Sequence, residues 1–147
     1  MGLPFDQLKK ALKSFDVDEQ TKEIVSETSG DITDLNTADQ LFIDGINTDG
    51  DKLKAYSNPY KNYKRRINQP SDRTTLKLTG DFHKSFKVKT TSKDFTVFAT
   101  DKKTKKLTAK YGKKIFGLTL DNQSLYSEIV LVPNIVKNFR KSLNLKK

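Results

Sequence analysis

One stretch of the sequence interleaves aromatic and basic side chains. Its aromatic residues are Tyr56, Tyr60 and Tyr63, and its basic residues are Lys61, Lys64, Arg65 and Arg66. Aromatic rings among cations can stack on bases and hold phosphates. The alternative is that the tyrosines pack on a sheet while the charges stay solvated. We favour this alternative, because the tyrosines share one helical face and the charges largely take another.

A second basic run follows later in the chain, at Lys102, Lys103, Lys105 and Lys106. Three interpretations stay open for it. It is a solvated loop tip, a contact to DNA, or a contact to an acidic neighbouring protein. Together the two basic segments supply the candidate subunit or DNA contacts.

The residue types that catalysis and metal binding need are sparse. The chain has no cysteine and one histidine, His83, which excludes thiol catalysis, disulfides and thiolate metal sites. The turn around Gly50 fails as a calcium loop, since Gly45 and Tyr56 would occupy the ligand positions 1 and 12. No phosphate-binding glycine motif is present. We therefore predict no catalytic residue, no metal site and no cofactor, and we predict that the chain is not an enzyme.

Length and composition fit one domain, residues 1–147. We expect a helical N-terminal arm over 1–35 and an α+β core over 36–147. No apolar h-region follows Met1 and no apolar run is long enough to span a membrane, so we expect neither a signal peptide nor membrane contact.

Charge is distributed unevenly along the chain. Residues 1–50 hold 4 Lys/Arg against 11 Asp/Glu, a net charge of −7, and residues 51–147 hold 24 against 7, a net charge of +17. Two interpretations follow. The basic side faces nucleic acid, or the acidic side of one copy faces the basic side of the next in a head-to-tail ring.

Helical spacing and capping signals predict most elements. The first predicted helix covers 4–15, with Pro4 in its first turn. The second covers 19–29, after a cap at Asp16 or Asp18 and before a stop at Gly30, and the third covers 38–46, with a capping box at Thr37 and Gln40. A helix capped by Asn58 follows, with Pro59 in its first position; residues 101–106 are a basic tip or the start of a short helix to Tyr111 ended by Gly112; and a last helix covers 120–144, capped by Thr119 and restarted or kinked at Pro133.

Alternating residues at 87–89 and a β-rich run at 95–99 predict two strands, joined by a hairpin turn at 91–94. The resulting fold class is α+β. It consists of a small antiparallel sheet packed by helices, with N-terminal helices and a long C-terminal helix.

Two short motifs carry a resemblance to a known family. The first is Leu-x-x-Thr-Gly-x-Phe-x-x-Ser, with Thr79, Gly80, Phe82 and Ser85, and the second is Phe116-Gly117-Leu118 followed by Thr119. With spaced matches over residues 40–145, the chain resembles the virion-morphogenesis and tail-completion proteins of tailed phages. That group includes the Mu-type morphogenesis protein and siphophage neck proteins. The family often has Arg-Pro before its Phe-Gly-Leu, where this chain has Lys113-Lys114-Ile115.

The resemblance implies a non-enzymatic structural protein of the virion. It would form or join a homo-oligomeric ring of six or twelve copies at the head–tail interface and contact portal or adaptor and tail proteins. It could touch the DNA in the channel without reading its sequence. Assembly would take place in the host cytoplasm. The alternative is a free basic nucleic-acid-binding protein. A nuclease would need a carboxylate cluster that the sequence does not show.

Overall fold

The computed structural model describes residues 5–91 and 93–143. Its helices are α1 (Phe5–Ser14), α2 (Val17–Glu27), α3 (Ser29–Asp34), α4 (Asn58–Arg66), α5 (Asp81–Lys84), α6 (Thr104–Tyr111), α7 (Leu120–Tyr126) and α8 (Val132–Ser142). Two π-helical segments, η1 (Leu35–Asp44) and η3 (Ser127–Leu131), and one 3₁₀ turn, η2 (Lys113–Ile115), complete the helical part. The strands β1 (Phe86–Thr90) and β2 (Phe95–Ala99) pair antiparallel. The predicted α+β fold class is confirmed.

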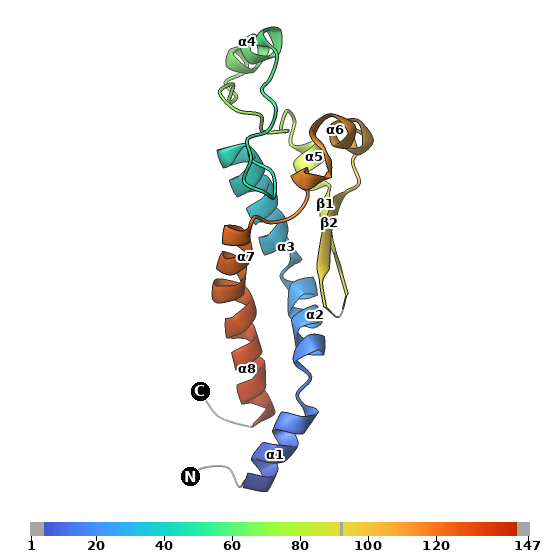
Figure 1. Cartoon of the computed structure of the whole chain (residues 1–147), viewed down its shortest axis with the longest axis vertical. Coiled ribbons are helices and arrows are strands. Elements are labelled where there is room, and N and C mark those ends of the chain that lie inside the picture. Colours follow the sequence, from blue (N-terminus) through green and yellow to red (C-terminus); the bar gives the residue numbers. More distant parts are fainter. Residues whose placement is uncertain (1–4, 92, 144–147) are drawn as a thin grey trace.

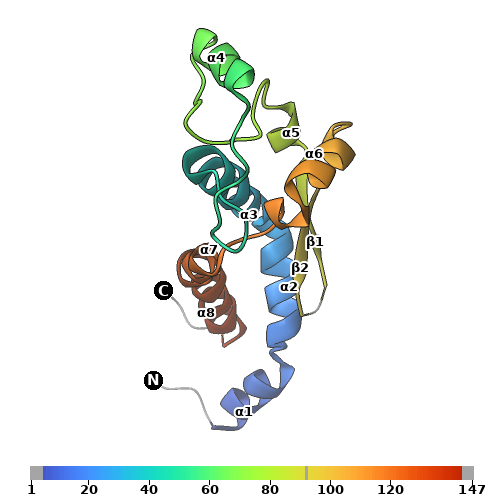
Figure 2. The same ribbon diagram turned by 45° about the horizontal axis from the view of Figure 1, so that its top comes forward.

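The molecule is long and narrow, built from two helical columns that run side by side in opposite directions (Figure 1). The N-terminal column is α2, α3 and η1, and the C-terminal column is α7, η3 and α8. They meet mainly through α2 and α8. The β-hairpin lies along α2 and α3, while α4 stands at one end of the molecule and α1 at the other (Figures 1 and 2).

The start of α2 matches one of the two predicted caps. The carboxylate of Asp16 accepts a hydrogen bond from the backbone N–H of Glu19 at 3.1 Å, which satisfies one of the free donors at a helix start. The predicted stop at Gly30 is wrong. Gly30 lies inside α3 and does not take the left-handed conformation that ends helices. Helix α2 ends earlier, at Glu27 with Thr28 as its C-cap, and α3 runs past Gly30 with Ile32 completely buried.

The helix predicted over 38–46 is present as part of η1, but its predicted start and its capping box are wrong. Helical structure is continuous from Ser29 to Asp44, so Thr37 and Gln40 lie within it. The hydroxyl of Thr37 donates to the carbonyl of Thr33 at 2.8 Å. A capping motif needs a free helix end, and here the preceding turn already occupies that place.

Several later signals are confirmed. Pro59 lies in the first turn of α4, although Ser57 rather than Asn58 takes the N-cap position. Gly112 ends α6. The hydroxyl of Thr119 accepts from the N–H of Asn122 at 3.2 Å and begins α7.

The interruption expected at Pro133 is also present. The π-helical segment η3 precedes it, and Pro133 falls in the first turn of α8, where its missing N–H is tolerated. The expectations for Pro4 and residue 144 lie outside the described residues.

The hairpin buries one face only. Val88 pairs with Val97 in the register, and Phe86 and Val97 are buried while Lys87 and Phe98 on the outer face are exposed. A two-stranded sheet is marginal alone, so its stability comes from packing on α2 and α3. Across the described ranges, no helix is both long and apolar enough to cross a membrane.

Candidate functional site: a basic cleft lined by tyrosines

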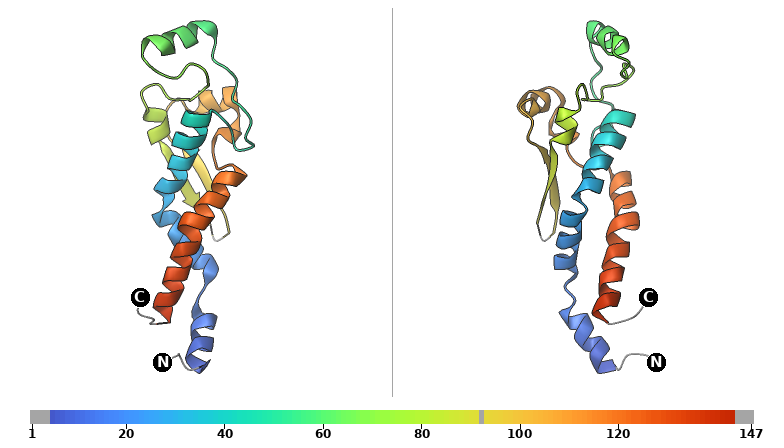
Figure 3. Two further views of the ribbon diagram at one scale, coloured as in Figure 1. Left: turned by 90° about the vertical axis from the view of Figure 1, so that its left-hand side faces the viewer. Right: turned by 180° about the vertical axis from the view of Figure 1, so that it is seen from behind.

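A cleft of about 340 Å³ opens between α6 and the segment of residues 54–80, which we call the head. The head contains α4 and stands at the end of the molecule opposite α1 (Figures 1 and 3). The aromatic side chains lining the cleft are Tyr56, Tyr60, Phe82 and Tyr111, and the basic ones are Lys77, Lys103, Lys106 and Lys110. Segments that lie far apart in sequence thus combine aromatic rings and cations in one place.

The tyrosines of α4 pack on each other. The ring centroids of Tyr56 and Tyr60 are 4.8 Å apart in an edge-to-face arrangement, and those of Tyr60 and Tyr63 are 5.8 Å apart. Tyr60 and Tyr63 lie in α4 and Tyr56 lies just before it, so the rings cluster without all three sharing a helical face. The favoured packing on the sheet is wrong, since α4 stands away from the hairpin (Figure 2). Burial, followed by the neighbouring phenols, raises the pKa of Tyr60 above its usual value. Tyr60 therefore stays neutral near pH 7, and its hydroxyl can donate a hydrogen bond.

Lys64 contradicts the expectation that the basic residues of this stretch stay solvated. Its side chain is completely buried. Its ammonium donates to Oε1 of Gln69 at 2.5 Å and to the backbone carbonyl of Lys77, and it lies 5.5 Å from the ring centroid of Tyr56. Burial lowers the pKa of Lys64. Lys64 is thus the internal anchor of the head and cannot reach a ligand in the cleft.

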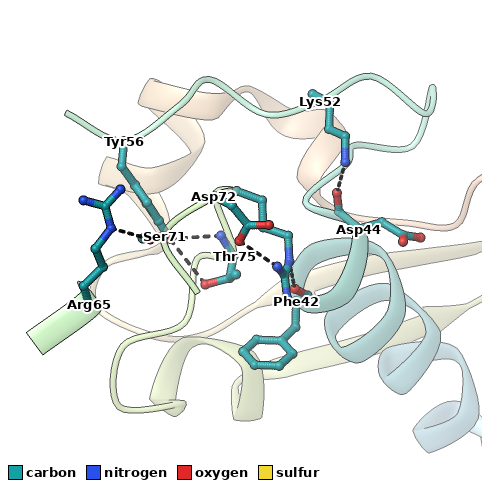
Figure 4. Close-up of polar contacts among 9 residues, drawn as sticks. Phe42, Asp44, Lys52, Tyr56, Arg65, Ser71, Asp72 and Thr75 are labelled. Atoms are coloured by element: carbon teal, nitrogen blue, oxygen red, sulfur yellow. Dashed lines mark hydrogen bonds and ion pairs between the residues drawn. The ribbon is translucent and has the colours of Figure 1, made fainter. Parts of the chain in front are cut away.

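The other predicted basic residues of α4 do not line the cleft. Arg65 and Arg66 are exposed and Lys61 is half-buried. The Nε of Arg65 donates to the hydroxyl of Ser71 at 3.3 Å (Figure 4), which ties the end of α4 to the loop that follows it.

The second basic run divides in two. Lys103 and Lys106 line the cleft, whereas Lys102 and Lys105 are exposed and do not. Sequence reasoning missed Lys110, although it follows Lys106 by four residues and so shares its helix face. Lys77 gave no such signal, because it comes from an irregular segment.

Thr75 connects the head to the rest of the molecule through its backbone. Its N–H donates to the hydroxyl of Tyr56 at 2.9 Å (Figure 4), and its carbonyl lies 2.8 Å from Nε2 of His83. Because a carbonyl only accepts, Nε2 of His83 carries the proton. Burial, with smaller contributions from Lys77 and Lys64, lowers the pKa of His83 to about 4. His83 is therefore a neutral packing residue at pH 7.

The first resemblance motif forms the turn that precedes the hairpin. Gly80 adopts a φ of 92°, in the left-handed region that favours glycine. The hydroxyl of Thr79 donates to the carboxylate of Asp81 at 2.8 Å. Phe82 is buried in the core, and the hydroxyl of Ser85 donates to the carbonyl of Phe82 at 2.8 Å. The motif thus positions α5 under the cleft.

The second motif is held by two buried amides of η1. Asn36 donates to the carbonyl of Ile115 at 3.0 Å and accepts from the N–H of Gly117 at 2.8 Å. Gln40 donates to the carbonyl of Gly117 at 2.9 Å and accepts from the N–H of Thr119 at 2.8 Å. The two side-chain amides thus make the hydrogen bonds to the backbone of residues 115–119 that a neighbouring strand would otherwise make.

The side chains around the second motif complete its burial. Leu118 is buried, and Phe116 packs on Phe86 with 5.2 Å between ring centroids. Sequence reasoning missed the role of Asn36 and misassigned Gln40. The available signal was their spacing of four residues from Ile32 and from each other, on a face that otherwise faces the core.

Comparison with family models, curated proteins and solved structures gave no match for this chain. Among the residues that the structure describes, no group of three or more His, Asp or Glu side chains is placed to hold a metal ion. The cleft combines aromatic rings with lysine side chains, so it suits stacking and anion binding.

Proposed function

We propose that this chain is a structural protein of a tailed-phage particle that forms or joins a ring at the head–tail interface. The observation that carries the proposal is an apolar stripe left open to water on the C-terminal column. Its members are Leu125, Ile129, Val132 and Val136, each more than 40% exposed. They recur at spacings of four, three and four residues, which places them on one helical face.

An exposed apolar stripe of this kind is typical of a surface that another protein covers. The narrow two-column shape supports the same role, because such a subunit presents long flanks to neighbours (Figure 3). The choice of a phage neck or tail-completion ring rests on the resemblance motifs around Gly80 and Gly117. In this role the protein makes and breaks no covalent bond. Its contacts would be to further copies, to a portal or adaptor and to tail proteins.

The test begins with particles. Mass spectrometry of purified virions should find the chain, and imaging should place it in the neck. In solution, light scattering of the purified protein should show association that rises with concentration, or binding to a portal complex. A protein that stays monomeric with and without portal, and that is absent from particles, would overturn the proposal.

A second candidate function is supported by the cleft itself. The cleft places two tyrosines beside three lysines, namely Tyr60 and Tyr111 beside Lys103, Lys106 and Lys110. Bases of single-stranded nucleic acid could stack on the tyrosine rings while the lysines neutralise its phosphates. A free nucleic-acid-binding protein should bind a labelled oligonucleotide as a monomer. Its affinity should fall steeply with salt, because binding releases counterions. Within a ring, the same cleft would contact channel DNA without reading sequence.

The matched variants separate these outcomes. Lys106→Ser with Lys110→Ser removes two cations that line the cleft, whereas Lys102→Ser with Lys105→Ser removes two exposed cations that do not line it. Binding through the cleft predicts that only the first pair weakens oligonucleotide affinity strongly and lowers the salt slope by about two. Equal losses for both pairs would show that net charge alone drives binding.

A further inference from the structure

A groove of about 260 Å³ runs between the two columns, where α3 and η1 face α7 and η3. One wall is apolar and includes Leu125 and Ile129, which are exposed. The opposite wall carries three carboxylates, at Asp31, Asp34 and Asp39. The groove therefore has an apolar wall on one side and a rim of three aspartates on the other. Its lining residues include no lysine or arginine.

The floor of the groove is rigid. Tyr126 is buried beneath it, and its hydroxyl lies 2.7 Å from that of Thr28. The Thr28 hydroxyl donates to the carbonyl of Ile24 at 2.7 Å, so Tyr126 is the donor in the first bond. These two hydrogen bonds connect the C-terminal column to the N-terminal column and keep the groove preformed.

Helix α1 has the complementary pattern. Its large apolar residues are Phe5, Leu8 and Leu12, and Phe15 follows directly after its last residue. Within the described ranges, the ring of Phe15 packs edge-to-face on Phe139 with 5.0 Å between centroids. Phe5 and Leu12 are 79% and 56% exposed. Half of this amphipathic helix is thus left uncovered by the residues that the structure describes.

The open edge of α1 is basic. Lys9 follows Phe5 by four residues and precedes Leu12 by three, so it lies on the same edge, and Lys13 follows one turn later. Phe5 and Leu12 are seven residues apart, about 10.5 Å along a helix. Such an edge, apolar with lysines beside it, matches a groove that is apolar with carboxylates beside it.

The helix cannot fill the groove of its own chain as it is placed. The groove is lined by residues of α3, η1, α7 and η3. These elements lie midway along the columns or above, whereas α1 lies beyond the ends of α2 and α8 (Figures 1 and 3). A second copy is therefore the occupant that the charges and the apolar residues fit.

We propose that α1 of one copy docks in the groove of the next copy. Phe5 and Leu12 cover Leu125 and Ile129, and Lys9 and Lys13 face the aspartates of the rim. This inference rests on the proposed ring function and names its subunit contact. The contact joins different surfaces of the two copies, so it propagates head to tail and closes into a ring when the rotation permits.

Cross-linking tests the contact directly, because the chain has no cysteine of its own. The double variant Leu12→Cys with Ile129→Cys should form a ladder of disulfide-linked oligomers under mild oxidation. The control, Leu12→Cys with Phe98→Cys, uses an exposed residue of the hairpin and should give no ladder beyond dimers. A ladder of equal extent in both variants would overturn the docking.

Charge reversal provides the second measurement. Lys9→Glu with Lys13→Glu, and separately Asp31→Lys with Asp34→Lys, should each weaken self-association at least about tenfold, because like charges then meet. Mixing the two reversed proteins should restore a heteromeric contact, since the acidic arm of one meets the basic groove of the other. Circular dichroism checks that both variants fold.

The outcomes separate the docking from the ring function. Wild-type protein that assembles while neither reversal changes its association would overturn the docking and leave the ring function standing. Wild-type protein that stays monomeric and is absent from particles would overturn the ring function itself.

Discussion

The head and the body of this protein, the body being residues 17–53 and 81–143, both depend on buried polar side chains, but of different kinds. In the body, the neutral amides Asn36 and Gln40 hold residues 115–119 beside an apolar core that includes Ile32 and Leu118. In the head, the side chain of Lys64 bonds Gln69, and tyrosines packed edge-to-face take the place of aliphatic packing.

The difference follows from what each solution costs. A buried amide is neutral, so pairing all its donors and acceptors makes burial tolerable. A buried ammonium loses its hydration, and hydrogen bonds and aromatic rings only partly offset this loss. We therefore expect the body to be the stable part and the head to open locally at lower free energy. The four predictions below test that contrast, from the largest effect to the smallest.

Gln40→Leu should damage the body most. The substitution leaves the carbonyl of Gly117, the N–H of Thr119 and the side chain of Asn122 without their partner. We expect a loss of about 4 kcal/mol in the free energy of unfolding, because each unpaired buried group costs on the order of 1–3 kcal/mol. Urea unfolding measures it, with the exposed Gln7→Leu as control. A loss as small as that of the control would contradict the role of the amide.

The junction between body and head should respond to pH through His83. The pKa of His83 is about 4 in the folded protein against 6.5 as its ordinary value. Between these values the unfolded chain binds a proton that the folded chain does not, so stability falls as pH drops from about 6.5 towards 4. The full effect is up to about 3 kcal/mol, and it vanishes above pH 6.5.

His83→Gln should remove this part of the pH dependence, since glutamine can still donate to the Thr75 carbonyl but does not titrate. The comparison is the difference between wild type and variant in urea unfolding at pH 7 and pH 4.5. The carboxylates titrate in both proteins, so they cancel in the difference. Parallel pH profiles for the two proteins would exclude a buried neutral histidine.

Gly117→Ala should weaken the body less than the loss of Gln40. Gly117 has a φ of 117°, and an added Cβ would lie 3.1 Å from Cγ2 of Thr48. We expect a loss of about 2 kcal/mol from backbone strain and crowding. Gly30→Ala is the matched control, because Gly30 is helical with nothing within 4 Å of its Cβ position. The control should be neutral or stabilising by up to about 1 kcal/mol, and equal losses at both positions would refute the strain argument.

Lys64→Met should loosen the head alone. It removes the bonds to Gln69 and to the carbonyl of Lys77 while also removing a buried charge, so the two effects partly offset each other. We expect backbone amides of residues 61–66 to exchange hydrogen about tenfold faster, equivalent to about 1.4 kcal/mol, with no change in α2 or α8. Arg66→Met, at an exposed position, is the control. Uniform acceleration across the chain would mean that head and body unfold as one unit.

Helix ends and strands were predictable where the residues that fix them lie close together in the sequence. The alternation at 87–89 and 95–99 predicted the hairpin, and Asp16, Gly112 and Thr119 marked helix ends, because each acts on residues within one or two turns. The Gly30 stop and the capping box at Thr37 failed for the opposite reason. Both patterns had local meaning, but with Ile32 and the amides of η1 buried, the segment from Ser29 to Asp44 is helical throughout.

The site was predictable only as two basic segments. Sequence placed cations in α4 and in the run at 102–106, and half of the latter run lines the cleft. It could not show that Lys64 turns inward, nor that Lys77 joins the cleft. Those outcomes depend on how the irregular residues 67–80 fold back over α4, and no periodic pattern describes that path.

By itself, the sequence determined the α+β class, the hairpin, most helix ends and the division into an acidic first third and a basic remainder, since these follow from neighbouring residues and composition. Only the tertiary structure decided which polar side chains are buried and which apolar faces stay open. Asn36 meets Gly117 across 81 positions of the chain. Such a contact depends on how the two columns pack, because a side chain is desolvated by whatever distant segment covers it and not by its neighbours in sequence.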